Sequence, residues 1–299
     1  MKQENLPNDN AIKAKILPAR ANIVLFLFLT YWLFIPHAVY ALIDVEPMSL
    51  FAYSATISTV RFLPPILIYL LFAKKPPRAV FSLAPLSLTT VLYIVVITAA
   101  VRIIEFLLEF GLPLAFGFAP PPWTQMGPAW VHLMAVVLLG SVYREFMIRG
   151  VLYSEYRDQG VSIGKTALVT GLFFGLTHVG LVGIAASAML GIFWAYLLYY
   201  TRSIWAPLIS HAIYNALWQM HPAFRIGNQA EYEAWLPTFV LILGIAALFA
   251  APAMVVCAKK FWAENRREPE ARMEESKAFT WSYWALIGVM TAAIVVFRV

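Results

Sequence analysis

Long apolar runs separated by short polar connections dominate the pattern along this chain. Several runs are long enough for a helix to cross a hydrocarbon core of about 30 Å, which takes roughly 20 residues. The pattern predicts an all-α fold, a polytopic transmembrane helix bundle of about eight to nine spans. The expected spans cover residues 22–43, 51–73, 88–110, 129–156, 164–182, 183–200, 204–220, 235–258 and 279–299.

The connection 111–128 differs from the others because it holds four prolines, Pro113, Pro120, Pro121 and Pro122. Proline lacks a backbone N–H, and its ring clashes with the preceding helical turn. We therefore expect an outer loop or a re-entrant cap here, and no regular helix.

Composition agrees with a membrane protein and excludes an ordinary water-soluble domain. Hydrophobic residues make up 61% of the 299 residues and charged residues 13%, and the mean hydropathy is +0.73. A soluble fold has too little interior to bury so much apolar surface. Cys257 is the single cysteine, so no intramolecular disulfide can form.

Basic residues, which give a formal net charge of +6, gather in alternate connections, where Lys and Arg favour the cytoplasmic side. They lie in segment 1–21, in the second, fourth and sixth connections, and in the charged linker 259–278. We therefore expect a cytoplasmic N-terminal segment without a removable signal peptide, and a C-terminus on the outer side. No basic stripe with interleaved aromatic residues appears, so the lipid bilayer is the expected partner and nucleic acid is not.

Three of the predicted spans carry polar side chains in an apolar setting, where each one needs a partner or a function. In each span two residues lie four apart and so share one helix face. The pairs are Glu145 with Arg149, Phe174 with His178, and His211 with Asn215. If these faces converge, a carboxylate, two imidazoles and an amide meet in one buried pocket.

Such a set is chemically sufficient for peptide hydrolysis. A carboxylate and a histidine can hold and deprotonate a water, and a second histidine with an asparagine can donate hydrogen bonds to the oxyanion. Each pair also has a simpler interpretation: Glu145 with Arg149 as an intrahelical ion pair, and His211 with Asn215 as a contact between spans. No Gly-x-Ser-x-Gly motif is present, so a serine mechanism is not expected.

Other polar residues in the spans are assigned no chemistry. Four of them are expected to pair with one another or to line the cavity: Arg61, Arg102, Glu105 and Glu109. Three histidines are expected to be packed or interfacial: His37, His132 and His221.

The three pairs follow one another in an order that resembles the CAAX protease and bacteriocin-processing family (CPBP or Abi) of intramembrane endopeptidases. The family motifs are two glutamates, three residues and arginine; then Phe-x-x-x-His; then His-x-x-x-Asn. The matching stretches begin at Arg144, Phe174 and His211, and the resemblance covers about 139–216.

The resemblance implies an enzyme that hydrolyses a peptide bond in a membrane-anchored or prenylated-like peptide or protein. It also implies a prokaryotic cytoplasmic membrane and no obligatory cofactor. The catalytic residues would be Glu145, His178, His211 and Asn215, supported by Arg149, Phe174 and Arg144.

One position departs from the family pattern. Arg144 stands where the first glutamate would be, to which the family gives the water-activating role. Either Glu145 takes over as the base, or the site has lost hydrolysis and kept the scaffold. The second alternative describes a non-catalytic immunity, chaperone or adaptor protein that holds a partner helix in the pocket.

Two further alternatives come from other chemistry. A zinc ion bound by Glu145, His178 and His211 would give a metal-dependent variant, although no HExxH pair supports it. A transporter would require broken spans in related halves, and the chain shows no such repeat. We therefore expect one membrane domain, with N-terminal helices and an outer loop in 22–128, the catalytic core in 129–220 and C-terminal helices in 221–299.

Overall fold

The protein, seen in a computed structural model, is built of packed helices. The structure describes residues 20–32, 34–35, 38, 49–73, 75–118, 128–178, 181–221, 226–266 and 288. Within this part of the chain the regular elements are all helical, which confirms the predicted all-α fold. Five stretches are long and apolar enough to cross a membrane: α2 (Leu50–Phe72), α4 (Leu88–Phe116), Ala129–Asp158, α9 (Leu181–Thr201) and α11 (Gln229–Glu264).

Shorter helices complete the described part of the bundle. Two of them are apolar, Arg20–Trp32 and α8 (Ile163–Leu176). The others are α3 (Pro77–Val80), α10 (Trp205–Leu217) and the 3-10 turn η3 (Trp218–Met220). The predicted final span 279–299 lies outside the described residues, apart from residue 288.

The stretch Ala129–Asp158 is one continuous rod with two unusual segments. Its parts are α5 (Ala129–Val131), η1 (His132–Gly140), α6 (Ser141–Glu145), η2 (Phe146–Leu152) and α7 (Tyr153–Asp158). Both η1 and η2 are π-helical, so their wider turns are closed by hydrogen bonds from i to i+5. Such turns are often found at functional sites, and here they flank the predicted site residue Glu145.

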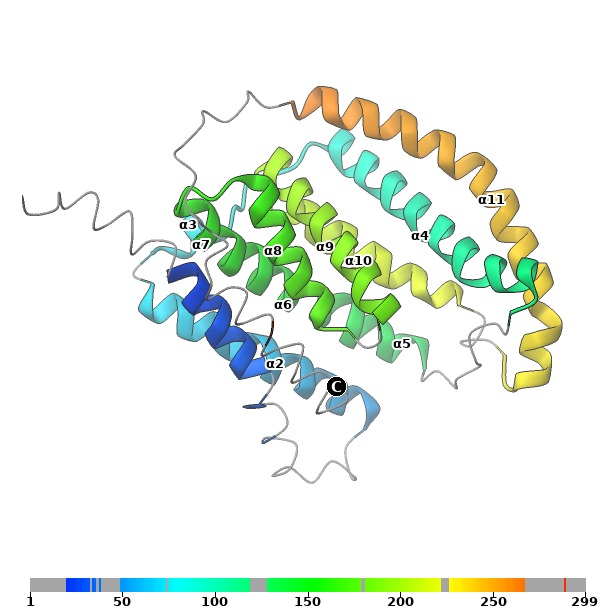
Figure 1. Cartoon of the computed structure of the whole chain (residues 1–299), viewed down its shortest axis with the longest axis horizontal. Coiled ribbons are helices and arrows are strands. Elements are labelled where there is room, and N and C mark those ends of the chain that lie inside the picture. The colour runs from blue at the N-terminus through cyan, green and yellow to red at the C-terminus, as the bar shows by residue number, and fades with distance from the viewer. Residues whose placement is uncertain are drawn as a thin grey trace, which may run out of the picture.

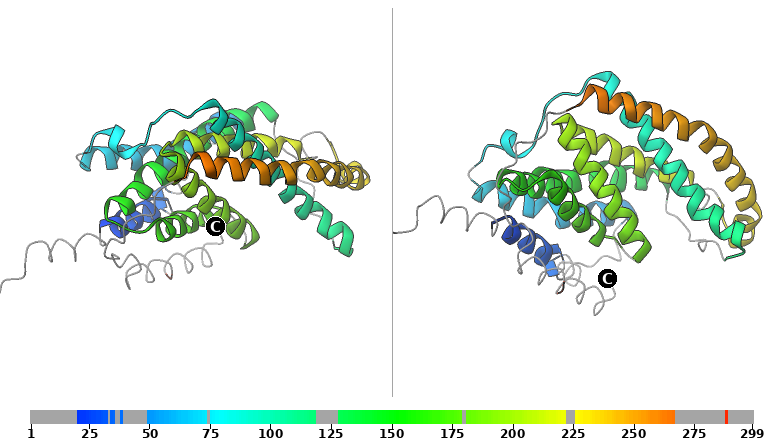
Figure 2. Two further views of the ribbon diagram at one scale, coloured as in Figure 1. Left: turned by 90° about the horizontal axis from the view of Figure 1, so that it is seen from above. Right: turned by 45° about the horizontal axis from the view of Figure 1, so that its top comes forward.

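The helices lie in a row, as Figure 1 shows. Arg20–Trp32 and α2 form one side, the rod and the group of α8, α9 and α10 form the middle, and α4 and α11 form the other side. The views in Figure 2 keep α4 beside α11. Helix α10 is central because it packs against the rod, α9 and α4.

Helices α8 and α9 approach each other through small residues. Gly171 and Gly175 lie four apart on α8, and a methyl group added at Gly171 would lie 2.8 Å from the carbonyl oxygen of Ala188. On α9, a methyl group added at Gly191 would lie 2.8 Å from the Cα of Gly171. Membrane helices associate through this kind of backbone contact. It fixes α8 and α9 together, and these helices carry Phe174 and Trp194 of the site.

A second polar centre joins the rod to the first helices. Glu155 is buried. Its carboxylate forms ion pairs with Lys75 Nζ at 2.9 Å and Arg20 Nε at 3.3 Å, and it accepts a hydrogen bond from the hydroxyl group of Tyr69. Burial alone would lower the pKa of the Lys75 ammonium, but its hydrogen bonds to Asp158 and Glu155 outweigh burial and raise that pKa. Glu155 therefore ties Arg20–Trp32, α2 and α7 into one unit.

The expectation that 111–128 holds no regular helix is wrong for its first residues. Helix α4 continues through Pro113 to Phe116 and ends at Gly117, which has a φ of 70°. The amide of Phe118 donates to the carbonyl oxygen of Pro113 at 2.9 Å and closes the helix end. A helix in lipid tolerates an internal proline because neighbouring helices, side chains or local adjustments of the turn satisfy the backbone groups that it frees. Residues 119–127 lie outside the described part.

Two other predicted boundaries also moved. The span expected over 164–182 ends at Leu176, because the amides of Thr177 and His178 turn back to Phe174 and Gly175. The helix expected to end at residue 258 continues to Glu264, so the charged linker 259–278 begins inside α11. The predicted orientation, with the N-terminus inside, stays a prediction.

We predict that Gly171→Ala lowers the free energy of unfolding by about 1–3 kcal/mol, because the added methyl group meets the α9 backbone. Chemical or thermal denaturation in detergent micelles measures this. Gly244→Ala in α11 is the matched control, since nothing lies within 4 Å of its new methyl group. Equal stability of the two variants would contradict the close α8–α9 contact.

Candidate active site

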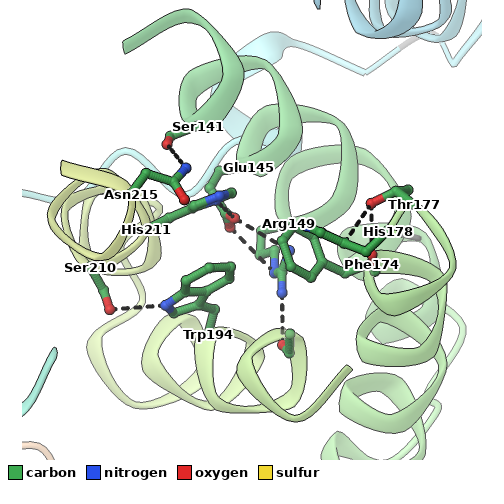
Figure 3. Close-up of polar contacts among 11 residues, drawn as sticks. Ser141, Glu145, Arg149, Phe174, Thr177, His178, Trp194, Ser210, His211 and Asn215 are labelled. Atoms are coloured by element: carbon green, nitrogen blue, oxygen red, sulfur yellow. Dashed lines mark hydrogen bonds and ion pairs between the residues drawn. The ribbon is translucent and has the colours of Figure 1, made fainter. Parts of the chain in front are cut away.

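Glu145 is the centre of the polar pocket. It ends α6, and its side chain is completely buried. His211 Nδ1 lies 2.7 Å from Glu145 Oε1 and joins α10 to the rod. A carboxylate only accepts hydrogen bonds, so Nδ1 donates and the free lone pair of the imidazole lies on Nε2. The predicted convergence of Glu145 and His211 is thus present (Figure 3).

Arg149, one helical turn after Glu145, supplies the positive charge. Its Nε lies 3.3 Å from Glu145 Oε2, and its Nη1 lies 3.3 Å from Oε1. Nη2 donates to the carbonyl oxygen of Gly191 at 2.7 Å, which links the rod to α9. The predicted ion pair between Glu145 and Arg149 is therefore present, and its arginine also holds the backbone of α9.

Aromatic rings enclose the imidazole of His211. The ring of Trp194 stacks on it, with the centroids 4.1 Å apart and the planes at 19°. Phe174 meets the same imidazole edge-on at 5.4 Å. The guanidinium of Arg149 lies over the rings of Phe174 and Trp194 at 5.2 and 5.6 Å. Phe174 therefore packs inside the site against both His211 and Arg149.

Asn215 belongs to the same face of α10, as its spacing from His211 predicts. Its Nδ2 donates to Ser141 Oγ at 3.1 Å, and Ser141 lies one turn before Glu145 on the rod. His132 Nε2 lies 3.1 Å from the backbone oxygen of Asn215. His211 and Asn215 thus make two parallel contacts with two residues of α6.

His178 is the predicted site residue that the structure places apart from Glu145. It follows the end of α8, with its Nδ1 3.0 Å from the carbonyl oxygen of Phe174 and 3.3 Å from Thr177 Oγ1. Figure 3 shows it beside Phe174 and Thr177. No hydrogen bond or ion pair joins the described residues His178 and Glu145. The predicted neighbours Phe174 and His178 do lie side by side, with their ring centroids 4.8 Å apart, although α8 ends at Leu176 and His178 lies beyond the helix.

Arg144 is directed to a different neighbour from Glu145. Its guanidinium carbon lies 5.5 Å from the ring of Phe62 on α2, whereas Glu145 contacts α10. The Nε of Arg144 is buried without a hydrogen-bond partner. The two adjacent side chains therefore serve different interfaces, and Arg144 does not displace Glu145 from His211.

Two of the remaining polar residues pair as predicted, since Arg102 Nη1 lies 2.8 Å from Glu105 Oε2. Arg61 instead lies over the ring of Trp32. His221 packs against the rings of Phe110 and Trp218. His37 lies outside the described residues.

The zinc alternative requires Glu145, His178 and His211 to meet as three ligands. Among the described residues, no three side chains of His, Cys, Asp or Glu come together as metal ligands would. Glu145 and His211 meet, but His178 does not join them, so this set does not fit a three-ligand zinc site.

The site is thus a buried Glu–His pair between two helices of a helical bundle, the rod and α10. A family model described as "Type II CAAX prenyl endopeptidase Rce1-like" matches residues 126–217. This match confirms the predicted resemblance for that segment, which contains the rod, α8, α9 and α10. Neither the curated proteins nor the solved structures that we compared with the chain gave a match.

Three contributors to the site were missed by sequence reasoning. Ser141 lies four residues before Glu145, and that spacing is a signal that could have found it. Trp194 lies in an apolar run that has no helical periodicity, so no sequence pattern distinguished it from its neighbours. Ser210 accepts a hydrogen bond from the indole nitrogen of Trp194 at 2.9 Å.

We predict that Arg149→Met lowers the free energy of unfolding by about 3–5 kcal/mol, because it leaves the Glu145 carboxylate buried without a cation. Adding Glu145→Gln should recover part of that loss, since no buried charge then lacks a partner. Denaturation in detergent measures both variants. Arg78→Met, at an exposed position, is the control, and a loss at Arg149 as small as the control's would contradict the need for the pair.

Proposed function

We propose that this chain is an intramembrane endopeptidase that hydrolyses a peptide bond in a membrane-anchored, prenylated-like substrate. The observation that carries the proposal is the 2.7 Å hydrogen bond between His211 and the buried Glu145. The match of 126–217 to a CAAX endopeptidase family supports the same reaction class. The apolar helices around the site fit a substrate that arrives through the bilayer.

The carboxylate and the imidazole divide the work between them. Glu145 is completely buried and paired with Arg149, so its role is to orient His211 and to stabilise the imidazolium. His211 Nε2 then takes a proton from water, while the water oxygen bonds to the scissile carbonyl carbon. The proton passes to the amine nitrogen as the C–N bond breaks, and an acid and an amine leave.

Asn215 is the side chain suited to the oxyanion. Its Nδ2 carries two protons and gives one to Ser141, so the second can be donated to the developing negative charge. His178 donates Nδ1–H to the carbonyl oxygen of Phe174, so its Nε2 carries the lone pair and can accept a hydrogen bond from the attacking water. Neither group needs to contact Glu145 for its role.

We expect His211→Gln and Glu145→Gln each to lower kcat by about 10³- to 10⁴-fold, because each one removes the oriented base. The measurement is cleavage of membrane-anchored peptides by protein reconstituted in liposomes. Glu233→Gln, on the exposed start of α11, is the control for the same chemical change and should keep wild-type activity.

Metal dependence is tested in the same assay. We expect EDTA to leave cleavage unchanged, because Glu145, His178 and His211 do not converge on one point. Loss of cleavage in EDTA, with recovery on adding zinc, would contradict a mechanism in which the Glu145–His211 dyad activates water without a metal.

A second candidate is a non-catalytic protein that holds a partner helix in this pocket. The observation favouring it is Arg144, which stands at the position of the family's first glutamate and packs against Phe62 of α2. Under this candidate the wild type cleaves nothing, and Arg144→Glu creates cleavage. Under the endopeptidase proposal the wild type already cleaves the substrate, so activity does not depend on Arg144→Glu.

A further inference from the structure

Helix α10 makes polar contacts on the side facing α4 as well as on the side facing the rod. On the α4 side, Ser210 and Tyr214 lie four apart, and so do Thr98 and Arg102 on α4. Ser210 Oγ lies 2.7 Å from Thr98 Oγ1. Arg102 Nη1 donates to the hydroxyl oxygen of Tyr214 at 2.7 Å. Two successive turns of α10 are therefore bonded to two successive turns of α4.

On α10, Ser210 and Tyr214 each immediately precede a site residue. Ser210 comes before His211, which bonds to Glu145, and Tyr214 comes before Asn215, which bonds to Ser141. Neighbouring positions on a helix point about 100° apart. The contacts to α4 thus fix the rotation of α10 that aims His211 and Asn215 at the rod.

Trp194 connects the two sides of α10. Its indole nitrogen donates to Ser210 Oγ at 2.9 Å, and its ring stacks on His211 at 4.1 Å. The hydroxyl group of Ser210 is shared between Trp194 and Thr98. Loss of the Thr98 hydroxyl would therefore loosen both the helix and the ring that packs on the imidazole.

Arg102 is a fixed anchor for this arrangement. Its side chain is buried and pairs with Glu105 at 2.8 Å. Its guanidinium carbon lies 4.0 Å from the ring centroid of Phe106, 4.4 Å from that of Tyr214 and 4.5 Å from that of Trp218. A buried cation with these partners has few other places to lie.

We propose that Thr98 and Arg102 of α4 are positioning residues that hold α10 at the rotation where His211 meets Glu145. This inference rests on the proposed endopeptidase function for its kinetic meaning. A rotation of only about 20° moves a side-chain tip roughly 5 Å from the helix axis by about 2 Å. That displacement is enough to break the 2.7 Å bond. The family match begins after α4, so this part of the site machinery lies outside the matched segment.

The kinetic test uses changes that remove a hydroxyl group and little else. We expect Thr98→Val, Ser210→Ala and Tyr214→Phe each to lower kcat about 5- to 10-fold with an unchanged KM, because each one loses one or two of the hydrogen bonds that hold α10. Thr98→Val combined with Ser210→Ala should be no worse than the more impaired single variant. Thr170→Val is the control, since this buried hydroxyl bonds to carbonyl groups of its own helix.

A second readout does not depend on activity. In protein with ¹⁵N-labelled histidine, the His211 signal is identified among the five histidines by its loss in His211→Gln. We expect the Nδ1–H proton of His211 to shift upfield in the variant that combines Thr98→Val with Tyr214→Phe. It should stay in place in Thr170→Val.

The outcomes separate the two proposals. If the wild type cleaves nothing but the His211 signal shifts as expected, the positioning role of α4 stands and the endopeptidase function fails. If the wild type cleaves and the three hydroxyl variants keep both kcat and the His211 signal, α4 has no positioning role. A fall in kcat with an unmoved His211 signal also overturns the proposal.

Discussion

The rest of this structure depends on a carboxylate buried in a membrane bundle. Glu145 has no exposed surface, and an uncompensated charge at such a place costs several kcal/mol. Arg149 compensates this charge with an ion pair, and His211 compensates it with a hydrogen bond. Because these partners also contact α9 and lie on α10, the need to satisfy one charge fixes the relation among the rod, α9 and α10.

Burial of apolar surface alone could not fix how the rod, α9 and α10 are placed relative to one another. Lipid tails are as apolar as the helix surfaces, so membrane helices find one another through small residues and polar contacts. Both devices are present on opposite sides of the site. Gly171 and Gly191 bring α8 and α9 into backbone contact, and the Ser210 hydroxyl joins α10 to α4 and to Trp194. Each helix that carries a site residue is thus held by at least one contact specific to its rotation.

Helical spacing explains what could be predicted from the sequence. Glu145 with Arg149 is a local pair, so its geometry follows from the helix alone. The meeting of His211 with Glu145 could be expected because buried polar groups in lipid seek partners. The backbone at His178 could not be predicted, because it depends on where α8 ends, and the turn after Leu176 is set by hydrogen bonds of Thr177 that no periodicity reveals. Trp194 and the π-helical turns had no sequence signal, since an apolar run looks alike around its circumference.

The direction of Arg144 shows how the site retains its Glu–His pair while lacking the family's first glutamate. Arg144 packs on Phe62 of α2, whereas its neighbour Glu145 keeps His211 and Arg149. Residue 144 therefore packs on the side of the rod that faces α2, while the bond between Glu145 and His211 lies on the side that faces α10. In the proposed mechanism Glu145 orients the imidazole base of His211, so no second carboxylate is needed. The side of α10 that is bonded to α4 then controls where His211 Nε2 points.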